Sequence, residues 1–557
     1  MDAFHKTAGG VVAALRESAK HMPPLSQYQL SAVLAALSTH ALFQLHEFQP
    51  MDVLFAFSAL NLGLRLFLDK QTTETGIVVL QAQLNLIYFV SLFTSIAIYR
   101  RFLHRTRQFP GPFLASITKW WAWVVVYRGE YHRTVRALHN STKSDIVRVG
   151  PRELDICNVD FIGPLYGVGT KCIKGPWYEG TLMGSHHRFL QNEKPEGHLW
   201  KRRIWDAGFN SKSIREYEPH VLRVNEELLE KLKKLTKDGK PIDIGLYFAF
   251  FTWDIMGDLG FGESFDMINT GTANDAMNVV QGFTRFNSLV CTIPWCSTLF
   301  AWFPKDPKAE GLFTFAKERV KQRLPLGTTR DDIFTHLLRE DRVSKKKYSD
   351  LELILESLML TIGGSDTTSS SLATICYYLM ANPSKYAKLK AEIHPYDGPL
   401  THLHLAKFPY LNAVIREALR LLPPIGSGMM HRETPPEGLT VNGIHLPGNT
   451  SVGIGAYEIQ RDARYYGNPD EFIPERWLGE GPEPFDRNAF LVFSYGPYSC
   501  VGKHLAYLEL CDVIAGVVKT FDMEFAPGYD AGSYEMSIKD SVVSTRAHLS
   551  VILKARA

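Results

Sequence analysis

The sequence predicts a mainly α-helical protein with minor β sheets, preceded by an N-terminal membrane anchor. Three features lead to this fold class: an uncharged apolar run near the N-terminus, a proline- and glycine-rich break after it, and amphipathic helical runs through most of the remaining chain. The 557 residues, 45% hydrophobic and 21% charged, suffice for a large core. We expect an anchor region over residues 1–108, a hinge over 109–113 and a globular domain over 114–557.

The anchor region depends mainly on the stretch from Gly76 to Tyr99, which has no charged residue and is long enough to cross a bilayer as a helix. A cationic cluster follows directly, made of Arg100, Arg101, His104, Arg105 and Arg107. Positive charge beside a span favours the cytoplasmic side, so the globular domain should face the cytosol. Two weaker stretches, Leu30 to Leu45 and Val53 to Leu68, are open to spanning, interfacial or hairpin arrangements, which leaves one to three apolar helices.

Beyond the anchor, the chain shows a break, a strand pattern and long helical patterns. Phe109-Pro110-Gly111-Pro112 interrupts any helix, because proline lacks an amide donor and restricts the residue before it. The run from Ile146 to Pro151 alternates apolar and polar side chains and stops at a turn, which predicts a strand. From about Glu216 to Gln460 most of the pattern is helical. We therefore expect one large helical domain with its strands near the two ends.

Charge and cysteine content exclude several classes of function. A formal net charge of +3 over this length is too weak to indicate nucleic-acid binding. The seven cysteines are odd in number and form no C-x-x-C pair, which argues against a disulfide framework and a structural zinc site. A cysteine of this kind is first interpreted as a small buried apolar side chain. Only Cys500 has surroundings that indicate another role.

Cys500 lies in a glycine-rich loop that ends where a helix is predicted to begin. The loop reads Phe493-Ser494-Tyr495-Gly496-Pro497-Tyr498-Ser499-Cys500-Val501-Gly502, and Lys503 to Leu510 has a helical pattern. A thiolate just before a helix gains from the helix dipole and from free backbone amides, which lower its pKa and favour metal ligation. The flanking glycines let the backbone approach a flat cofactor without Cβ clashes.

This loop resembles the haem-binding signature F-x-x-G-x-R-x-C-x-G of the cytochromes P450. The matching positions are Phe493, Gly496, Cys500 and Gly502. The resemblance implies the cytochrome P450 fold, a bound haem b, and Cys500 as the axial ligand of the haem iron. The sequence departs from the signature at Tyr498, where the family usually has an arginine that pairs with a haem propionate.

Two further motifs agree with this resemblance. Glu417 and Arg420 share a helix face at a spacing of three, although a surface ion pair of this kind is common in any helix. Together with Pro474-Glu475-Arg476-Trp477 they resemble the E-x-x-R and P-E-R-F segments of the family. The resemblance implies that Glu417, Arg420 and Arg476 form a buried structural triad behind the haem.

Two basic sites resemble positions at which the family binds the haem propionates. His198 and Arg202 would share a helix face toward a carboxylate, and Arg432 follows a Leu-Pro-Pro segment. A solvated charged patch is the alternative interpretation of either site. If Arg202 and Arg432 do bind propionates, they could compensate for Tyr498.

A helical run from Leu351 onward carries Gly363-Gly364-Ser365-Asp366-Thr367-Thr368. A glycine in a helix interior costs ~1 kcal/mol relative to alanine, so a local widening or a close approach to a ligand should require the pair. Asp366 and Thr367 place an acid beside a hydroxyl, as proton delivery to bound dioxygen would need. The segment resembles the A/G-G-x-D/E-T-T/S motif of the family, and the alternative is a polar helix break.

The resemblance extends from Pro110 to the C-terminus and implies a monooxygenase of the endoplasmic reticulum membrane. Such an enzyme inserts one oxygen atom of O2 into an apolar small molecule and takes electrons from NADPH through a separate reductase. Within the family the sequence resembles fungal enzymes of specialised metabolism, particularly through Asp145 to Pro151 and Tyr498. A haem-thiolate isomerase or dehydratase and a non-catalytic haem-binding protein are the alternatives, and the Asp366-Thr367 pair argues against both.

The substrate pocket should draw on five segments of the chain. These are Tyr166 to Met183, Phe283 to Phe303, the helix face with Leu358, Met359 and Ile362, the stretch Ile425 to Met430, and Val542-Val543. Their side chains favour an apolar substrate such as a terpenoid or a prenylated aromatic compound.

Overall fold

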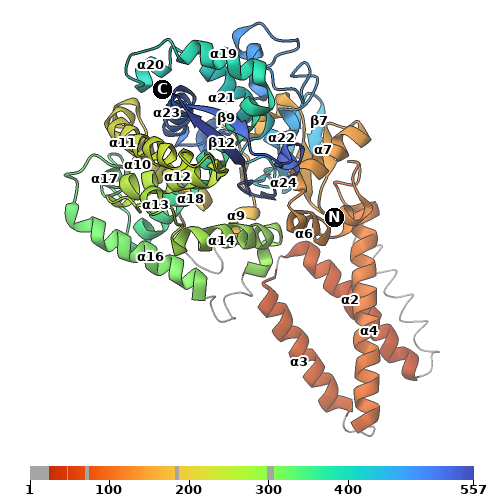
Figure 1. Ribbon diagram of the computed structural model, residues 1–557. Coiled ribbons are helices and arrows are strands. Elements are labelled where there is room, and N and C mark those ends of the chain that lie inside the picture. Colours follow the sequence, from red (N-terminus) through yellow and green to blue (C-terminus); the bar gives the residue numbers. More distant parts are fainter. Residues whose placement is uncertain (1–23, 47, 69–73, 182–186, 298–306, 557) are drawn as a thin grey trace. The chain divides into compact units, whose positions relative to one another are not determined.

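The chain folds into two compact units, which we describe separately (Figure 1). The computed structural model describes residues 24–46, 48–68, 74–181, 187–297 and 307–556. The first unit comprises the described residues up to Gln108 together with Pro112–Thr118, and the second comprises Phe109–Gly111 and the chain from Lys119 onward. The functional division into anchor, hinge and catalytic domain stays a prediction.

The first unit is built from apolar helices that pair through polar side chains. Its helices are α2 Pro24–Leu45, α3 Pro50–Leu68, α4 Glu74–Ile98, a π-helical turn Tyr99–Leu103 and α5 Phe113–Ile117. Asn85 Nδ2 of α4 donates a 2.7 Å hydrogen bond to Asn61 Oδ1 of α3, and Tyr88 of α4 donates a 3.0 Å bond to Thr39 of α2. Polar groups are thus satisfied between helices, as an apolar surrounding requires.

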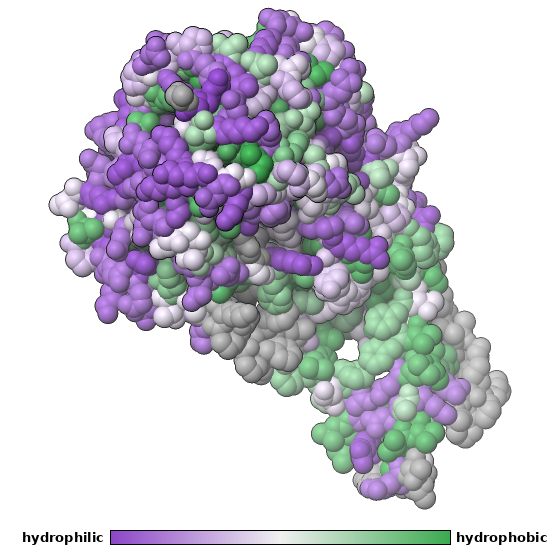
Figure 2. Space-filling view, viewed as in Figure 1, coloured by the Kyte–Doolittle hydropathy of each residue, from purple (hydrophilic) through white to green (hydrophobic). Residues whose placement is uncertain are grey.

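Apolar side chains, with polar ones among them, cover the helices of this unit on the face that Figure 2 shows. Large exposed side chains include Leu54, Phe55, Leu60, Leu86 and Phe93. Within the described residues, Gly76–Leu103 is the one helical stretch long and apolar enough to cross a membrane. The two weaker stretches of the sequence analysis also fold as helices, α2 and α3, without meeting that criterion.

The second unit is mostly helical, and Figure 1 shows α10 to α13 and α18 gathered in one half of it. Its helices are α6 Trp120–Arg128, α7 Tyr131–Thr142, α8 Ile162–Tyr166, α9 Trp177–Gly180, α10 Pro195–Gly208, α11 Ser211–Thr236, α12 Ile244–Phe261, α13 Met267–Thr270, α14 Asp275–Thr292, α16 Pro307–Arg323, α17 Ile333–Leu337, α18 Asp350–Ala381, α19 Pro383–Ile393, α20 His402–Leu405, α21 Pro409–Leu421, α22 Ala456–Ile459, α23 Lys503–Thr520 and α24 Tyr534–Ser537. The mainly α fold class is confirmed.

The long helix α18 crosses the core beside α12. A capping box starts it: Ser349 N donates to Glu352 Oε2 at 2.9 Å, and Glu352 N donates to Ser349 Oγ at 3.3 Å. The helix is α-helical throughout, so the local widening that its glycine pair would permit is absent. A Cβ on Gly364 would lie 2.2 Å from Met256 Sδ of α12, which identifies helix packing as the reason for this glycine. A Cβ on Gly363 would meet only Met359 Cε, at 3.3 Å.

The strands of the second unit form small sheets. The largest has the order β1 Ile146–Arg148, β2 Glu153–Ile156, β8 Ser451–Gly453, β5 Arg432–Glu433, β3 Ile173–Lys174, which places β3 at an edge. A second sheet joins β4 Ile242–Asp243, β12 Ser550–Ala555 and β9 Phe521–Phe525, and two hairpins pair β6 Leu439–Val441 with β7 Ile444–Leu446 and β10 Asp540–Ser541 with β11 Val543–Ser544. The strand predicted from Ile146 is confirmed as β1.

One expectation about the strands was wrong. Strands β5 to β8 lie between Arg432 and Gly453, inside a region whose pattern we interpreted as mostly helical, so strands are not confined to the two ends of the domain. The missed signal is Asn442-Gly443, a two-residue hairpin turn with φ of 48° and 80°. Asparagine and glycine tolerate positive φ and are the preferred residues at such a turn.

Candidate active site

A large cavity of about 1660 Å3 lies within the second unit. All five segments expected to form a pocket contribute to its lining, for example through Trp177, Phe283, Met359, Ile425 and Val543. Leu182, Met183 and residues 298–303 of those segments lie outside the described residues. Other parts of the wall lie outside these five segments, including Phe189 and Leu190 before α10 and Leu312 and Phe313 of α16.

The loop before α23 brings Cys500 to this cavity. Cys500 N donates a 2.9 Å hydrogen bond to Phe493 O, which closes the loop. Gly496 has a φ of 70°, and a Cβ there would lie 1.9 Å from Tyr166 O, so only glycine fits. A Cβ on Gly502 would have open space around it, with Phe209 Cε1 at 3.8 Å and Cys500 Sγ at 3.9 Å. The backbone beside the sulfur is therefore bare on the Gly502 side.

The seven cysteines all lie within the described residues, and only Cys500 is exposed. It lines the cavity, so this exposure is toward the cavity even though the surrounding protein encloses the loop. Burial raises the pKa of the free Cys500 thiol, while the amides of Gly502 and Lys503 and the charge of Arg202 oppose the shift. We expected the helix start to lower this pKa, and for the free thiol burial outweighs it. A ligated metal cation would reverse the balance, because a coordinating thiol is deprotonated.

The segment Gly363 to Thr368 supplies a second wall of the cavity. Thr367 lines it, and its Oγ1 donates a 2.7 Å hydrogen bond to Gly363 O, which leaves the oxygen lone pairs as acceptors. Asp366 is not among the described residues that line the cavity, and Arg546 is the charge that acts on it. Burial raises the pKa of Asp366 to about 6, so near neutral pH this carboxyl can both hold and release a proton.

Glu509 of α23 is a cavity residue that the sequence analysis missed. It is buried, its Oε1 has no partner among the described residues, and burial raises its pKa to about 8. A hydrogen bond from the Thr368 side chain acts in the opposite direction. The available signal was a single acidic residue inside the apolar run Leu505 to Leu510.

The predicted propionate-binding residues meet around Tyr498. The His198 ring lies 4.4 Å from the Tyr498 ring, and burial together with nearby cations lowers the pKa of His198 to about 3. Arg202 NH groups donate to Ser499 O at 2.6 Å, Pro497 O at 3.1 Å and Asp206 Oδ1 at 2.7 Å. Arg202 thus holds the cysteine loop and is already paired with a carboxylate.

Arg432 extends from β5 into the same group of side chains. Its Nη1 donates a 3.0 Å hydrogen bond to Tyr178 OH, whereas its buried Nε has no partner within the described part of the chain. The guanidinium lies 4.8 Å from the centre of the Tyr498 ring. Its surroundings are buried and aromatic, which contradicts the solvated patch that was the alternative interpretation of this site.

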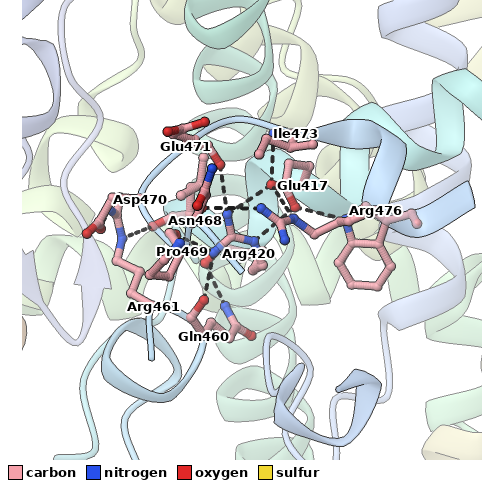
Figure 3. A network of polar contacts seen from close by, with 12 residues as sticks. Glu417, Arg420, Gln460, Arg461, Asn468, Pro469, Asp470, Glu471, Ile473 and Arg476 are labelled. Carbon is pink, nitrogen blue, oxygen red and sulfur yellow. Dashed lines mark hydrogen bonds and ion pairs between the residues drawn. The ribbon is translucent and has the colours of Figure 1, made fainter. Parts of the chain in front are cut away.

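Glu417, Arg420 and Arg476 meet in a fully buried network (Figure 3). Arg476 Nε donates to Glu417 Oε1 at 2.9 Å, and Trp477 Nε1 donates to Glu417 Oε2 at the same distance. Arg420 also donates to backbone carbonyls of Gln460, Pro469 and Glu471. None of the three charged residues lines the cavity, so their contacts fit a structural function.

These features fit a flat, anionic, metal-holding cofactor. The Cys500 thiol opens into a large, mainly apolar cavity, and Gly502 leaves room beside it. Cationic side chains gather at the same wall, where Arg432 Nε has no partner among the described residues. A haem has a ligand position for a thiolate and propionates for cations.

Comparison with known proteins decides the family. Residues 113–548 match the family described as "Cytochrome P450". The chain belongs to the cytochrome P450 family. P450 proteins bind haem b and incorporate oxygen into their substrates, so the expected cofactor and enzyme class are confirmed. P450 monooxygenases generally use a reductase as redox partner and bind small molecules.

Similar proteins are fungal P450 enzymes. The cytochrome P450 monooxygenase FCK2 of Fusarium pseudograminearum is 31% identical over 546 residues, which cover 95% of this chain and 98% of that protein. Tryprostatin B 6-hydroxylase of Neosartorya fischeri is 34% identical and covers 80% of this chain and 81% of its own length. The crystal structure of the cytochrome P450DA heme domain has a TM-score of 0.67 at 16% identity, covers 76% of this chain and 93% of its own, and supports the fold alone.

Proposed function

We propose that this P450 inserts one oxygen atom from O2 into an apolar small molecule of specialised metabolism, with electrons from NADPH delivered by a separate membrane-bound reductase. The observation that carries the proposal is that the Cys500 thiol and the Thr367 hydroxyl line one cavity with mainly apolar walls. A thiolate ligand favours cleavage of the O–O bond, and a positioned hydroxyl can assist the proton transfers that this cleavage needs. The fungal relatives, among them a hydroxylase by name, support the same class of reaction.

In this proposal the Cys500 thiolate would bind the haem iron. Haem supplies the activation of dioxygen. Phe493 O accepts a hydrogen bond from the Cys500 amide, Gly496 allows the positive φ and the close approach of Tyr166 O that shape the loop, and the bare backbone at Gly502 would leave room for the cofactor. His198, Arg202 and Arg432 form the cofactor wall: Arg432 offers positive charge, Arg202 positions the loop, and His198 packs as a neutral ring on Tyr498.

Thr367 and Asp366 would transfer protons to the reaction site. Because Thr367 Oγ1 already donates to Gly363 O, the hydroxyl can accept a hydrogen bond from water in the cavity and pass a proton by rotating. Asp366 would return a proton to the Thr367 hydroxyl, because its raised pKa of about 6 lets the carboxyl take up and release a proton near neutral pH. Glu417, Arg420 and Arg476 would take no part in proton transfer and would hold the structure under the loop.

The apolar wall favours an apolar substrate. Trp177, Phe283, Met359, Ile362 and Val543 are among the lining side chains, and they offer contact area with few hydrogen-bonding groups. A terpenoid or a prenylated aromatic compound matches this surface.

We also propose that residues 1–108 anchor the enzyme in the endoplasmic reticulum membrane, with 109–113 as the hinge and 114–557 as the catalytic domain on the cytosolic side. The support is the apolar stretch Gly76–Leu103 and the arginines that begin at Arg100. Membrane lipid would surround the exposed apolar side chains of this region.

The test is turnover by the purified full-length enzyme with an NADPH reductase and candidate apolar metabolites under isotopically labelled dioxygen. We expect substrate-dependent NADPH consumption and one labelled oxygen atom in the product. Product formed without NADPH or dioxygen would overturn the proposal and favour the isomerase alternative.

A further inference from the structure

Two cations face each other across the edge of the largest sheet. In the antiparallel pair of β3 and β5, Lys174 lies directly opposite Arg432. Like charges at such positions destabilise a sheet. Neither side chain forms an ion pair with a carboxylate in the part of the chain that the structure describes. The arrangement therefore needs another source of negative charge.

Both cations converge on the ring of Tyr498. The Lys174 ammonium lies 4.7 Å from the ring centre and the Arg432 guanidinium lies 4.8 Å from it. Lys174 Nζ has one donor engaged, to Leu190 O at 2.9 Å, and the buried Arg432 Nε has no partner among the described residues. All three side chains line the cavity that also receives Cys500. Unused donors thus remain on both cations at the cavity wall.

The surrounding charges do not offset this pair. Glu193 is bound by Lys201 at 2.8 Å, and burial raises the pKa of Glu356 to about 8, which keeps it largely protonated at neutral pH. Burial and the charge of Arg432 lower the pKa of Lys174 to about 7, as expected for a cation without an anion. An anionic ligand would relieve this penalty.

Arg202 is a weaker source of unpaired charge. Its Nε is bound to Asp206 Oδ1 and its Nη1 to two carbonyls of the cysteine loop, so its charge is already balanced. Among the described cations around Tyr498, the unbalanced charges are Lys174 and Arg432, which equal in number the two propionates of haem b.

We propose that Lys174 and Arg432 bind the two haem propionates as a cross-strand pair, with the Tyr498 ring as the platform between them. Lys174 then supplies the positive charge that the arginine of the haem-binding signature would bring at position 498. The proposal rests on the proposed haem-thiolate function and names the residues that recognise the cofactor.

The test compares full-length holoenzymes carrying Lys174→Met or Lys171→Met. Lys171 is a matched control, because it lies three residues away, is exposed, pairs with Glu437 and does not line the cavity. Loss of a charge-assisted hydrogen bond should speed haem transfer to excess apomyoglobin about 10- to 100-fold in Lys174→Met. The propionate bending band of the resonance Raman spectrum should shift in the same variant. Lys171→Met should leave both readouts at the parent values.

Two further variants separate a direct contact from a structural effect. Lys174→Arg should retain haem at nearly the parent rate, and Lys174→Met combined with Tyr498→Arg should regain most of the lost retention, because the charge returns at the neighbouring position. Parent-like haem transfer and an unchanged propionate band in Lys174→Met would overturn the proposal. The proposal would also be overturned if the double variant lost haem to apomyoglobin as fast as Lys174→Met does. The thiolate-type spectrum with carbon monoxide, measured on each variant, reports on Cys500 separately, so failure of this proposal is distinguishable from failure of the proposed function.

Discussion

Arg420 donates two parallel hydrogen bonds to Glu417, from Nε to Oε2 and from Nη2 to Oε1, and each is 2.9 Å long. The same carboxylate accepts from Arg476, so one buried anion faces two buried guanidinium groups. Backbone carbonyls of Gly467 and Gln460, among others, accept the remaining donors. Within the described residues, Glu417 is therefore the one carboxylate that pairs with both arginines and offsets their buried charge.

Glu417→Ala should leave both arginines buried without an anion, which costs about 3–5 kcal/mol. We expect little haem-loaded protein and a lower unfolding temperature, measured by the ratio of haem to protein and by thermal denaturation. Glu475→Ala is the matched control, because Glu475 binds Lys385 at the edge of the same segment and is partly exposed. A stable, fully loaded Glu417→Ala enzyme that lost only turnover would contradict a structural role.

The two glycines of α18 should differ in their tolerance of a methyl group. Gly364→Ala should lower the free energy of unfolding, because its Cβ would come within 2.2 Å of Met256 Sδ and overpacking typically costs about 1–3 kcal/mol. Gly363→Ala should be tolerated by the fold, because only the flexible end of Met359 is near. Denaturation of both variants checks the prediction, which equal losses would refute.

Thr367→Ala should uncouple electron consumption from product formation. The variant removes the hydroxyl at the cavity wall and, with it, the side-chain hydrogen bond to Gly363 O. Haem content and substrate binding should therefore stay near the parent values. Proton relay by a positioned group is worth about 10²–10⁴-fold, so NADPH should be consumed with much peroxide and little product. Peroxide yield and product are measured together, with Thr361→Ala, a buried residue of the same helix outside the cavity lining, as control. If NADPH consumption stayed fully coupled to product formation in both Thr367→Ala and Asp366→Asn, the assignment of these residues to proton transfer would be wrong.

Removal of the residues before Phe109 should abolish most integral membrane association while haem binding persists. The reason is that the apolar stretch Gly76–Leu103 is lost, whereas the cavity and the cysteine loop belong to the second unit. Carbonate extraction and the haem spectrum measure the two outcomes. Complete extraction of the full-length protein by carbonate would contradict a spanning helix.

Local motifs made much of the fold and site predictable. The Cys500 loop, the Glu417 to Arg420 spacing and the Asp366-Thr367 pair are short in sequence, and each carries its own physical reason in glycine freedom, helix periodicity or side-chain chemistry. The family match and the helical fold agree with them.

Long-range pairings were not predictable in this way. Lys174 lies opposite Arg432 only because two strands of two residues pair across a long sequence separation, and strands that short have no periodicity to recognise. The free-thiol pKa of Cys500 depends on enclosure by the whole domain, which outweighs the local helix start. The orientation of Asp366 away from the cavity lining likewise follows from how α18 is rotated in the core.

The most direct test of the account is the absorption spectrum of the reduced enzyme with carbon monoxide. Thiolate ligation by Cys500 predicts a strongly red-shifted Soret band in the parent enzyme and its loss in Cys500→Ser, with Cys511→Ser, a buried cysteine of α23, keeping the band. A red-shifted band that survives in Cys500→Ser would contradict the assignment of this residue as the iron ligand.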